Sequence, residues 1–175
     1  MNYPKEFLTK IAELKNSDDF ESVYKFFDDL SLKGDQKLMK KACSEGLSEK
    51  KAKQKKRNIL LAATERGNLR LVKSLIEGGC NKEATDIFGS TALFYAASEG
   101  FLEIAKYLIS INASIAAHNI FGDTPLIYAS RNDQSLEVVK YFISLGVNKE
   151  EKNYDGKTAL QLAAPKVKEY LLSLG

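Results

Sequence analysis

Apolar and polar residues follow one another along the chain with the spacing of short amphipathic helices. In residues 102–110 the apolar positions share one face at a period of 3.6, and residues 136–144 repeat that pattern. Shorter segments rich in leucine and alanine precede them, such as Leu93 with Ala96 and Ala97. Glycine-containing turns separate the segments. The pattern predicts pairs of helices joined by tight turns, and therefore an all-α chain.

These helix pairs recur at a fixed interval. Residues 86–93 match residues 119–126 and again residues 153–160, and their central glycines are 33 and then 34 residues apart. The second helices, 102–110 and 136–144, match at an offset of 34. Because a single unit cannot bury its own apolar face, we expect adjacent units to stack and share a core.

The turns of this repeat carry a specific backbone requirement. Three glycines follow an Asx-type turn position, where a residue without Cβ can take positive φ; they are Gly89, Gly122 and Gly156. A threonine lies two residues after each of them, and its hydroxyl can cap the following helix. We therefore expect each turn to lead directly into a capped helix.

Together, the acidic or amide turn residue, the glycine, the threonine, the paired alanines and the closing apolar helix resemble the ankyrin repeat. The resemblance is clear over residues 58–175 and weaker over residues 20–57. The amino-acid sequence of residues 136–144 also resembles that of repeats in the large ankyrin arrays of unicellular eukaryotes. The resemblance implies an all-α solenoid of stacked helix–turn–helix units with short hairpin or turn tips.

The period divides the chain into an N-terminal cap and a set of repeats. We expect residues 1–57 to form a helical cap that contains a degenerate repeat and a basic linker. The remaining segments are expected to be repeats 58–85, 86–118 and 119–152 and a C-terminal cap, 153–175. In the N-terminal cap, a helix beginning at Pro4 is predicted to bury one apolar face, made of Phe7, Leu8, Ile11 and Ala12. A second helix is predicted to begin at Asp18, with Glu21 completing a capping box.

Composition limits the class of protein. The 175 residues are 44% hydrophobic and 28% charged, as in an ordinary folded domain. The two cysteines, Cys43 and Cys80, are too few for a disulfide framework, and we expect inert thiols in the repeat core. No apolar signal opens the chain, and the longest uncharged run, residues 107–122, is too short to span a bilayer. We expect a monomer without a membrane span, in the cytoplasm or the nucleus.

Charge is concentrated in one segment. The formal net charge is +3, but residues 48–57 alone contribute +5, and the parts before and after them each contribute −1. The basic segment consists of Lys50, Lys51, Lys53, Lys55, Lys56 and Arg57. It can serve as a nuclear-import signal or as a contact for nucleic acid or an acidic partner, or it can simply be solvated. It has no interleaved aromatic residues for base stacking, which makes nucleic acid the less favoured partner.

The chain offers little catalytic chemistry. Its single histidine, His118, has no second histidine, HExxH or CxxC motif beside it. Gly156-Lys157-Thr158 resembles the end of a phosphate-binding loop, but position 151, where that loop needs a glycine, is glutamate. We therefore expect no enzyme, no cofactor and no metal site.

The ankyrin resemblance implies that another protein binds to the concave surface made by the turn tips and the first helices. Carried over residue by residue, this surface comprises Ile87, Phe88, Ser90, Ser98 and Glu99, then His118, Ile120, Phe121, Asp123, Arg131 and Asn132, and finally Tyr154, Asp155 and Lys157. The apolar tip residues either form a binding ridge or pack beneath the neighbouring tip.

Two functions are thus compared. The first is a non-enzymatic scaffold that binds a partner protein through the concave face of the repeat stack. The alternative is a nuclear or nucleic-acid-associated regulator that acts through the basic segment, with the repeats as its scaffold.

Overall fold

The computed structural model describes residues 3–53 and 56–175. Within these ranges the chain forms eleven α-helices and two short 3₁₀ helices and no strand, which confirms the predicted all-α class. The helices group into two compact units, unit 1 (residues 1–82) and unit 2 (residues 83–175). This division does not coincide with the end of the expected N-terminal cap at residue 57.

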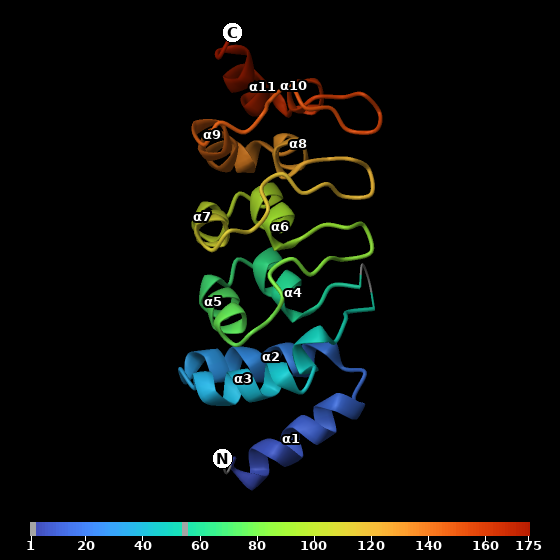
Figure 1. The fold of residues 1–175 in the computed structure, drawn as a ribbon, viewed down its shortest axis with the longest axis vertical. Coiled ribbons are helices and arrows are strands. Elements are labelled where there is room, and N and C mark those ends of the chain that lie inside the picture. Colours follow the sequence, from blue (N-terminus) through green and yellow to red (C-terminus); the bar gives the residue numbers. More distant parts are fainter. Residues whose placement is uncertain (1–2, 54–55) are drawn as a thin grey trace. The chain divides into compact units, whose positions relative to one another are not determined.

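Unit 1 is built from a leading helix and two helix hairpins (Figure 1). Its elements are α1 (Lys5–Asn16), α2 (Phe20–Leu32), α3 (Gln36–Ser44), η1 (Leu47–Glu49), α4 (Ile59–Glu65) and α5 (Leu69–Glu77). Helices α2 and α3 pack together, as do α4 and α5, and α3 and α2 both contact α5. Fully buried side chains such as Phe27, Met39, Leu60 and Leu71 fill the space between them.

The buried face of α1 differs from the predicted one. Phe7, Ile11 and Leu14 are buried, whereas Leu8 is 42% exposed and Ala12 is exposed as well. The reason is the stacking of Phe7 on Phe26 of α2, with ring centroids 5.8 Å apart, which turns the 7–11–14 stripe inward. The expectation for Leu8 and Ala12 was therefore wrong.

The start of α2 is also displaced by one residue from the prediction. The N-cap is Asp19, whose carboxylate accepts a hydrogen bond from the Ser22 amide, and the helix begins at Phe20. A capping box of Asp18 with Glu21 is not formed. Asp19 occupies the cap because its side chain lies three residues before a free helical N–H.

Unit 2 contains three successive repeats of tip, first helix and second helix. The elements are α6 (Ala92–Ser98), α7 (Leu102–Ser110), α8 (Pro125–Ser130), η2 (Asp133–Ser135), α9 (Leu136–Ser144), α10 (Ala159–Leu162) and α11 (Pro165–Leu172). The first helices α6, α8 and α10 pack in one row, and α7, α9 and α11 pack in a second row. Within this unit the three tip loops project on the side away from α7 and α9 (Figure 1). The arrangement is the helix–turn–helix stack that the repeat period predicted.

Large apolar side chains from both rows form the core of unit 2. Leu93, Phe94, Leu108 and Phe142 are each at most 1% exposed. Phe94 meets Tyr128 edge to face, with ring centroids 5.7 Å apart, so an aromatic pair joins the first helices of two neighbouring repeats.

The extra residue of the second repeat is accommodated by η2, which passes close to Gly100. Gly100 has a φ of +74°, and a Cβ on it would lie 2.3 Å from the carbonyl oxygen of Gln134. Glycine is therefore required there both by conformation and by space.

No helix in residues 3–53 and 56–175 combines the length and apolar character needed to cross a membrane.

Candidate functional site

Each tip of unit 2 is organised by one side chain at its start. The side-chain oxygens of Asp86, Asn119 and Asn153 accept hydrogen bonds from the backbone amides two and four residues later, at 2.8–3.1 Å. This is the Asx turn that the sequence predicted. The predicted positive φ angles are also present, at +74°, +73° and +72° for Gly89, Gly122 and Gly156.

Threonines connect the tips to the first helices. Thr124 and Thr158 are N-caps whose hydroxyls accept from Ile127 and Gln161, and Gln161 completes a capping box with Thr158. Thr91 occupies the same N-cap position without a side-chain hydrogen bond. The predicted capping position is confirmed in all three repeats, and the capping bond in two.

Neighbouring tips are hydrogen-bonded to each other through their backbones. The amide of Ile120 donates to the carbonyl of Phe88 at 2.9 Å, and the amide of Tyr154 donates to that of Phe121 at 3.1 Å. The rings of Phe88 and Phe121 stack with centroids 6.1 Å apart. The Tyr154 ring lies over Gly122, where a Cβ would come within 2.5 Å of its Cδ1. The three tips are thus held in a continuous row.

The outer surface of this row is apolar. Ile87, Ile120 and Phe121 are 53%, 56% and 52% exposed, and Tyr154 is 78% exposed. We name Ile87, Phe88, Ile120, Phe121 and Tyr154 the apolar ridge. Both isoleucines present more than half of their surface to solvent, so neither is buried beneath the next tip. Large apolar side chains gathered on one exposed edge are typical of a surface that is covered by another molecule.

Two of the expected contact residues are buried instead of facing a partner. Ser90 is 2% exposed and Asp123 is 0% exposed. Asp123 accepts two hydrogen bonds from the Arg131 guanidinium, at 2.6 and 3.0 Å, and one from Asn153 Nδ2 at 2.8 Å. Asp123 therefore points into the unit, where its hydrogen bond with Asn153 connects the second tip with the third. The expectation that Ser90 and Asp123 are available to a partner is therefore corrected.

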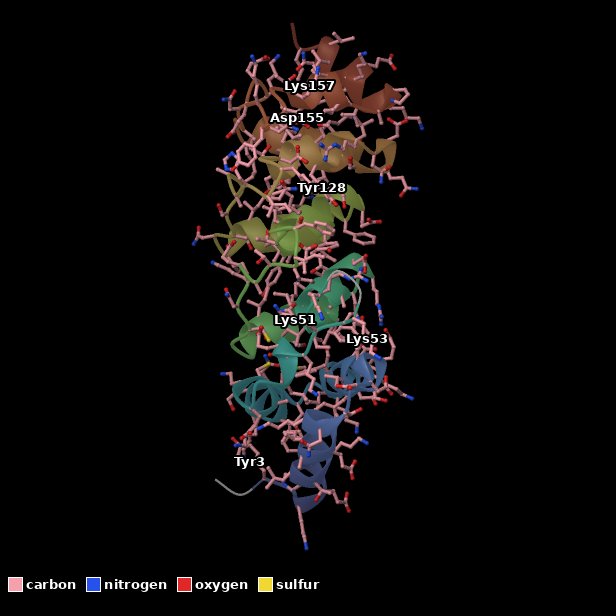
Figure 2. The ribbon with its side chains drawn as sticks, turned by 90° about the vertical axis from the view of Figure 1, so that its right-hand side faces the viewer. Tyr3, Lys51, Lys53, Tyr128, Asp155 and Lys157 are labelled. Carbon is pink, nitrogen blue, oxygen red and sulfur yellow. The ribbon has the colours of Figure 1, made fainter. Side chains whose placement is uncertain are left out.

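The remaining polar positions lie in the tips and at the C-terminal ends of the first helices. Asn132 donates through Nδ2 to the backbone carbonyl of Ser98 at 2.8 Å, while Glu99 is exposed. His118 Nε2 lies 2.8 Å from Glu151 Oε1 in the neighbouring repeat. Asp155 and Lys157 are exposed in the third tip, and Figure 2 marks them on the side from which the tips project.

Tyr128 is a candidate site residue that sequence reasoning missed. It lies on α8, labelled in Figure 2, with its ring 5.8 Å from the guanidinium carbon of Arg131. In the preceding repeat, the hydroxyl of Tyr95 donates to Asp86 Oδ2 at 2.8 Å. In the second repeat Asn119 stands in place of that aspartate. The recurrence of tyrosine at a spacing of 33 was the available signal.

The hydroxyl of Tyr128 is held in its neutral form. Burial raises its pKa above the ordinary tyrosine value, and the negative charge of Asp86 adds to that rise. The buried Nδ2 of Asn119 also has no hydrogen-bond partner in the part of the chain that the structure describes. The second repeat therefore carries on α8 a half-buried tyrosine whose pKa is raised.

The basic segment belongs to unit 1 and is only partly neutralised. Arg57 forms an ion pair with Glu65, and Lys50 Nζ donates to the carbonyl of Ser17 at 2.6 Å. A cavity of about 210 Å³ is lined by Ser17, Asp18, Phe20, Lys50, Lys51, Lys53 and Lys56. Lys51 and Lys53, two of these lining residues, are labelled in Figure 2. Lys55 lies outside the described residues.

Groups that could hold a metal do not converge in the described chain. Within residues 3–53 and 56–175, no three histidine, cysteine, aspartate or glutamate side chains gather as metal ligands would. His118 has a single carboxylate neighbour and no nucleophile in its hydrogen-bonding network. The arrangement in unit 2 is suited to contact with another surface.

Comparison with known families agrees with this geometry. A family model described as "Ankyrin repeats (3 copies)" matches residues 30–119 and 111–175, which together cover most of the chain. No curated protein matches the sequence. Ankyrin repeats are generally protein–protein interaction modules and are typically not enzymes. On the strength of this match and of the repeated tips and helices, the chain belongs to the ankyrin-repeat family.

Proposed function

We propose that this protein is a non-enzymatic interaction module that binds a partner protein through the apolar ridge and the adjoining first helices of unit 2. The observation that carries the proposal is the row of Ile87, Ile120, Phe121 and Tyr154, each more than half exposed on adjacent tips. A partner that covers these side chains removes apolar surface from water without rearranging the core. Each large side chain newly buried contributes about 1.5–3 kcal/mol.

Polar groups next to the ridge supply the specificity that apolar burial lacks. The Tyr128 hydroxyl can donate to a carbonyl or carboxylate of the partner, and Asp155 and Lys157 offer charges of both signs at the third tip. Arg131 is already engaged by Asp123, so its exposed edge is held in a fixed place. An apolar centre with such a rim is the usual composition of a protein-binding surface.

The proposal is tested with the double variant Ile120→Asp/Tyr154→Asp. Both side chains are exposed, so we expect an unchanged helical circular dichroism spectrum and little change in stability. Leu145→Asp is the matched control, because Leu145 is 49% exposed in the same unit but follows α9, in the other row of helices. Proteins captured by the wild type are identified by mass spectrometry, and the affinity of a purified captured protein is then measured by calorimetry.

We expect the double variant to weaken that affinity by roughly 10²–10⁴-fold, which corresponds to the loss of two buried apolar anchors. The control is expected to bind like the wild type. Equal affinities for the wild type and the double variant would show that the ridge is not the binding surface.

A further inference from the structure

The two cysteines of the chain lie in contact inside unit 1. Cys43 is in the last turn of α3, and Cys80 follows the end of α5, 37 positions later. Their sulfur atoms are 3.2 Å apart, within hydrogen-bonding distance, and both are free thiols. Cys80 is 8% exposed, while Cys43 is partly exposed. The pair is therefore a dithiol with limited access to solvent.

Packing fixes the two thiols relative to each other. Helices α3 and α5 pack directly together. After α5 the chain passes so near α3 that a Cβ on Gly78 would lie 3.0 Å from Met39 Cγ and 3.1 Å from Cys43 Sγ. Gly79 then turns the chain with a φ of +98°, and the Cys80 amide donates to the carbonyl of Leu75 at 3.0 Å. A glycine pair and a helix-terminal hydrogen bond thus bring Cys80 to Cys43.

The contact between the two sulfur atoms shifts their pKa values in opposite directions. The hydrogen bond with Cys43 lowers the pKa of Cys80, and burial opposes that effect. The pKa of Cys43 is raised by its hydrogen bond with Cys80 and by burial. Either sulfur can donate the S–H of this hydrogen bond, and Cys80 is the thiol whose pKa is lowered by the contact. A thiolate next to a thiol is the arrangement in which one sulfur reacts and the other completes a disulfide.

We propose that Cys43 and Cys80 form a two-electron oxidation site that reacts with hydrogen peroxide and ends as an intramolecular disulfide. In the first step the Cys80 thiolate, its proton already passed to water, attacks one peroxide oxygen. The O–O bond breaks, Cys80 becomes a sulfenic acid, and the departing hydroxide takes up a proton to become water.

In the second step the Cys43 sulfur attacks the Cys80 sulfur as its own proton is removed. The S–S bond forms, the S–O bond breaks, and the second oxygen leaves as water. The two thiols lose two electrons and the peroxide gains them, so one peroxide and two thiols give one disulfide and two waters. A small oxidant suits a sulfur that is 8% exposed, and a resolving thiol 3.2 Å away intercepts the sulfenic acid before further oxidation.

The expected consequence is a covalent link between α3 and the segment that ends the α4–α5 hairpin. Because the link joins residues 37 positions apart, it removes conformational freedom from the unfolded chain. The melting temperature of the oxidised protein is expected to rise by roughly 5–15 °C. This site is in unit 1 and does not rest on the function proposed for unit 2.

The experiment treats the reduced full-length chain with hydrogen peroxide after the reductant is removed. Thiols are titrated under denaturing conditions, and proteolytic peptides are mapped by mass spectrometry. We expect the thiol number to fall from two to none, a peptide that links Cys43 to Cys80, a monomeric protein, and full recovery of both thiols with dithiothreitol. Cys43→Ser and Cys80→Ser are the matched controls, and neither should gain thermal stability on oxidation.

Three results would overturn the proposal. They are two thiols that survive peroxide, separate sulfinic acids without a linked peptide, and disulfides formed only between molecules. Thiol titration and peptide mapping of the wild type decide the question even where a serine variant fails to fold.

Discussion

The Asp123 carboxylate connects two tips of unit 2, and its removal should destabilise the fold measurably. Its oxygens accept hydrogen bonds from Arg131 Nη1, Arg131 Nη2 and Asn153 Nδ2, and Asp123 is fully buried. In Asp123→Ala these three donors lose their acceptor at once. We expect lower stability with the same fold, because the apolar core of the unit is untouched.

The magnitude follows from how well each donor can be rehydrated. The Arg131 side chain is 38% exposed, so water can replace most of the hydrogen bonds that it loses with Asp123. Its contribution to the loss of stability is therefore at the low end of the range typical of hydrogen bonds to charged groups, about 1.5–3 kcal/mol. Asn153 is 6% exposed, so its amide is left nearly unpaired at a cost of about 1–3 kcal/mol. The sum is about 2.5–4.5 kcal/mol, which lowers the melting temperature by roughly 5–18 °C.

Urea unfolding followed by far-ultraviolet circular dichroism measures this loss. Asp155→Ala is the matched control, because Asp155 is exposed in the next tip, and it should change the stability by less than about 0.5 kcal/mol. A double-mutant cycle with Arg131→Ala should show a coupling of about 2 kcal/mol, since either single change removes the same bidentate contact. An Asp123→Ala variant within about 1 kcal/mol of the wild type, or a coupling near zero, would refute this reasoning.

Three further predictions concern charge and backbone conformation. Hydrogen bonds from two lysines lower the pKa of Glu45 to about 2, below its value in the unfolded chain. In urea unfolding the wild type should therefore be more stable than Glu45→Gln above about pH 4.5, and this difference should disappear as the pH falls to about 2. Gly100→Ala should cost more than Gly146→Ala by at least about 1 kcal/mol in the same assay, because both have positive φ but only the first Cβ meets a backbone oxygen. The basic segment is neutralised in the variant Lys50→Gln/Lys51→Gln/Lys53→Gln/Lys56→Gln, which should bind the partner with the affinity and the salt dependence of the wild type in calorimetry. Loss of binding in this variant, whose ridge is intact, would favour the alternative function.

The sequence alone was enough to predict the structural features that recur in each repeat. The Asx residue, the positive-φ glycine and the threonine cap recur at a spacing of 33 or 34, and the structure forms that turn in each tip of unit 2. Each feature depends on residues only a few positions apart, so local chemistry determines it. The exposed apolar side chains at Ile87, Ile120 and Tyr154 belong to the same repeating register.

Features that depend on distant neighbours were not predictable in the same way. The burial of Asp123 depends on its contact with Asn153, which lies 30 positions later in the chain, in the next tip. Cys43 and Cys80 are 37 positions apart, which is not a multiple of the repeat, and they meet only because Gly78 allows a close approach. The buried stripe of α1 depended on a ring in another helix, which no periodicity within α1 specifies.

The backbone hydrogen bonds between tips have a consequence for how fast and how tightly a partner is held. Since Ile120 and Tyr154 are fixed through their amides to the preceding tips, the ridge has little freedom left to lose on association. Binding energy is then not consumed in ordering loops, and it is available to slow dissociation. A rigid edge of this kind also discriminates by shape, because it cannot rearrange itself around a poorly fitting surface.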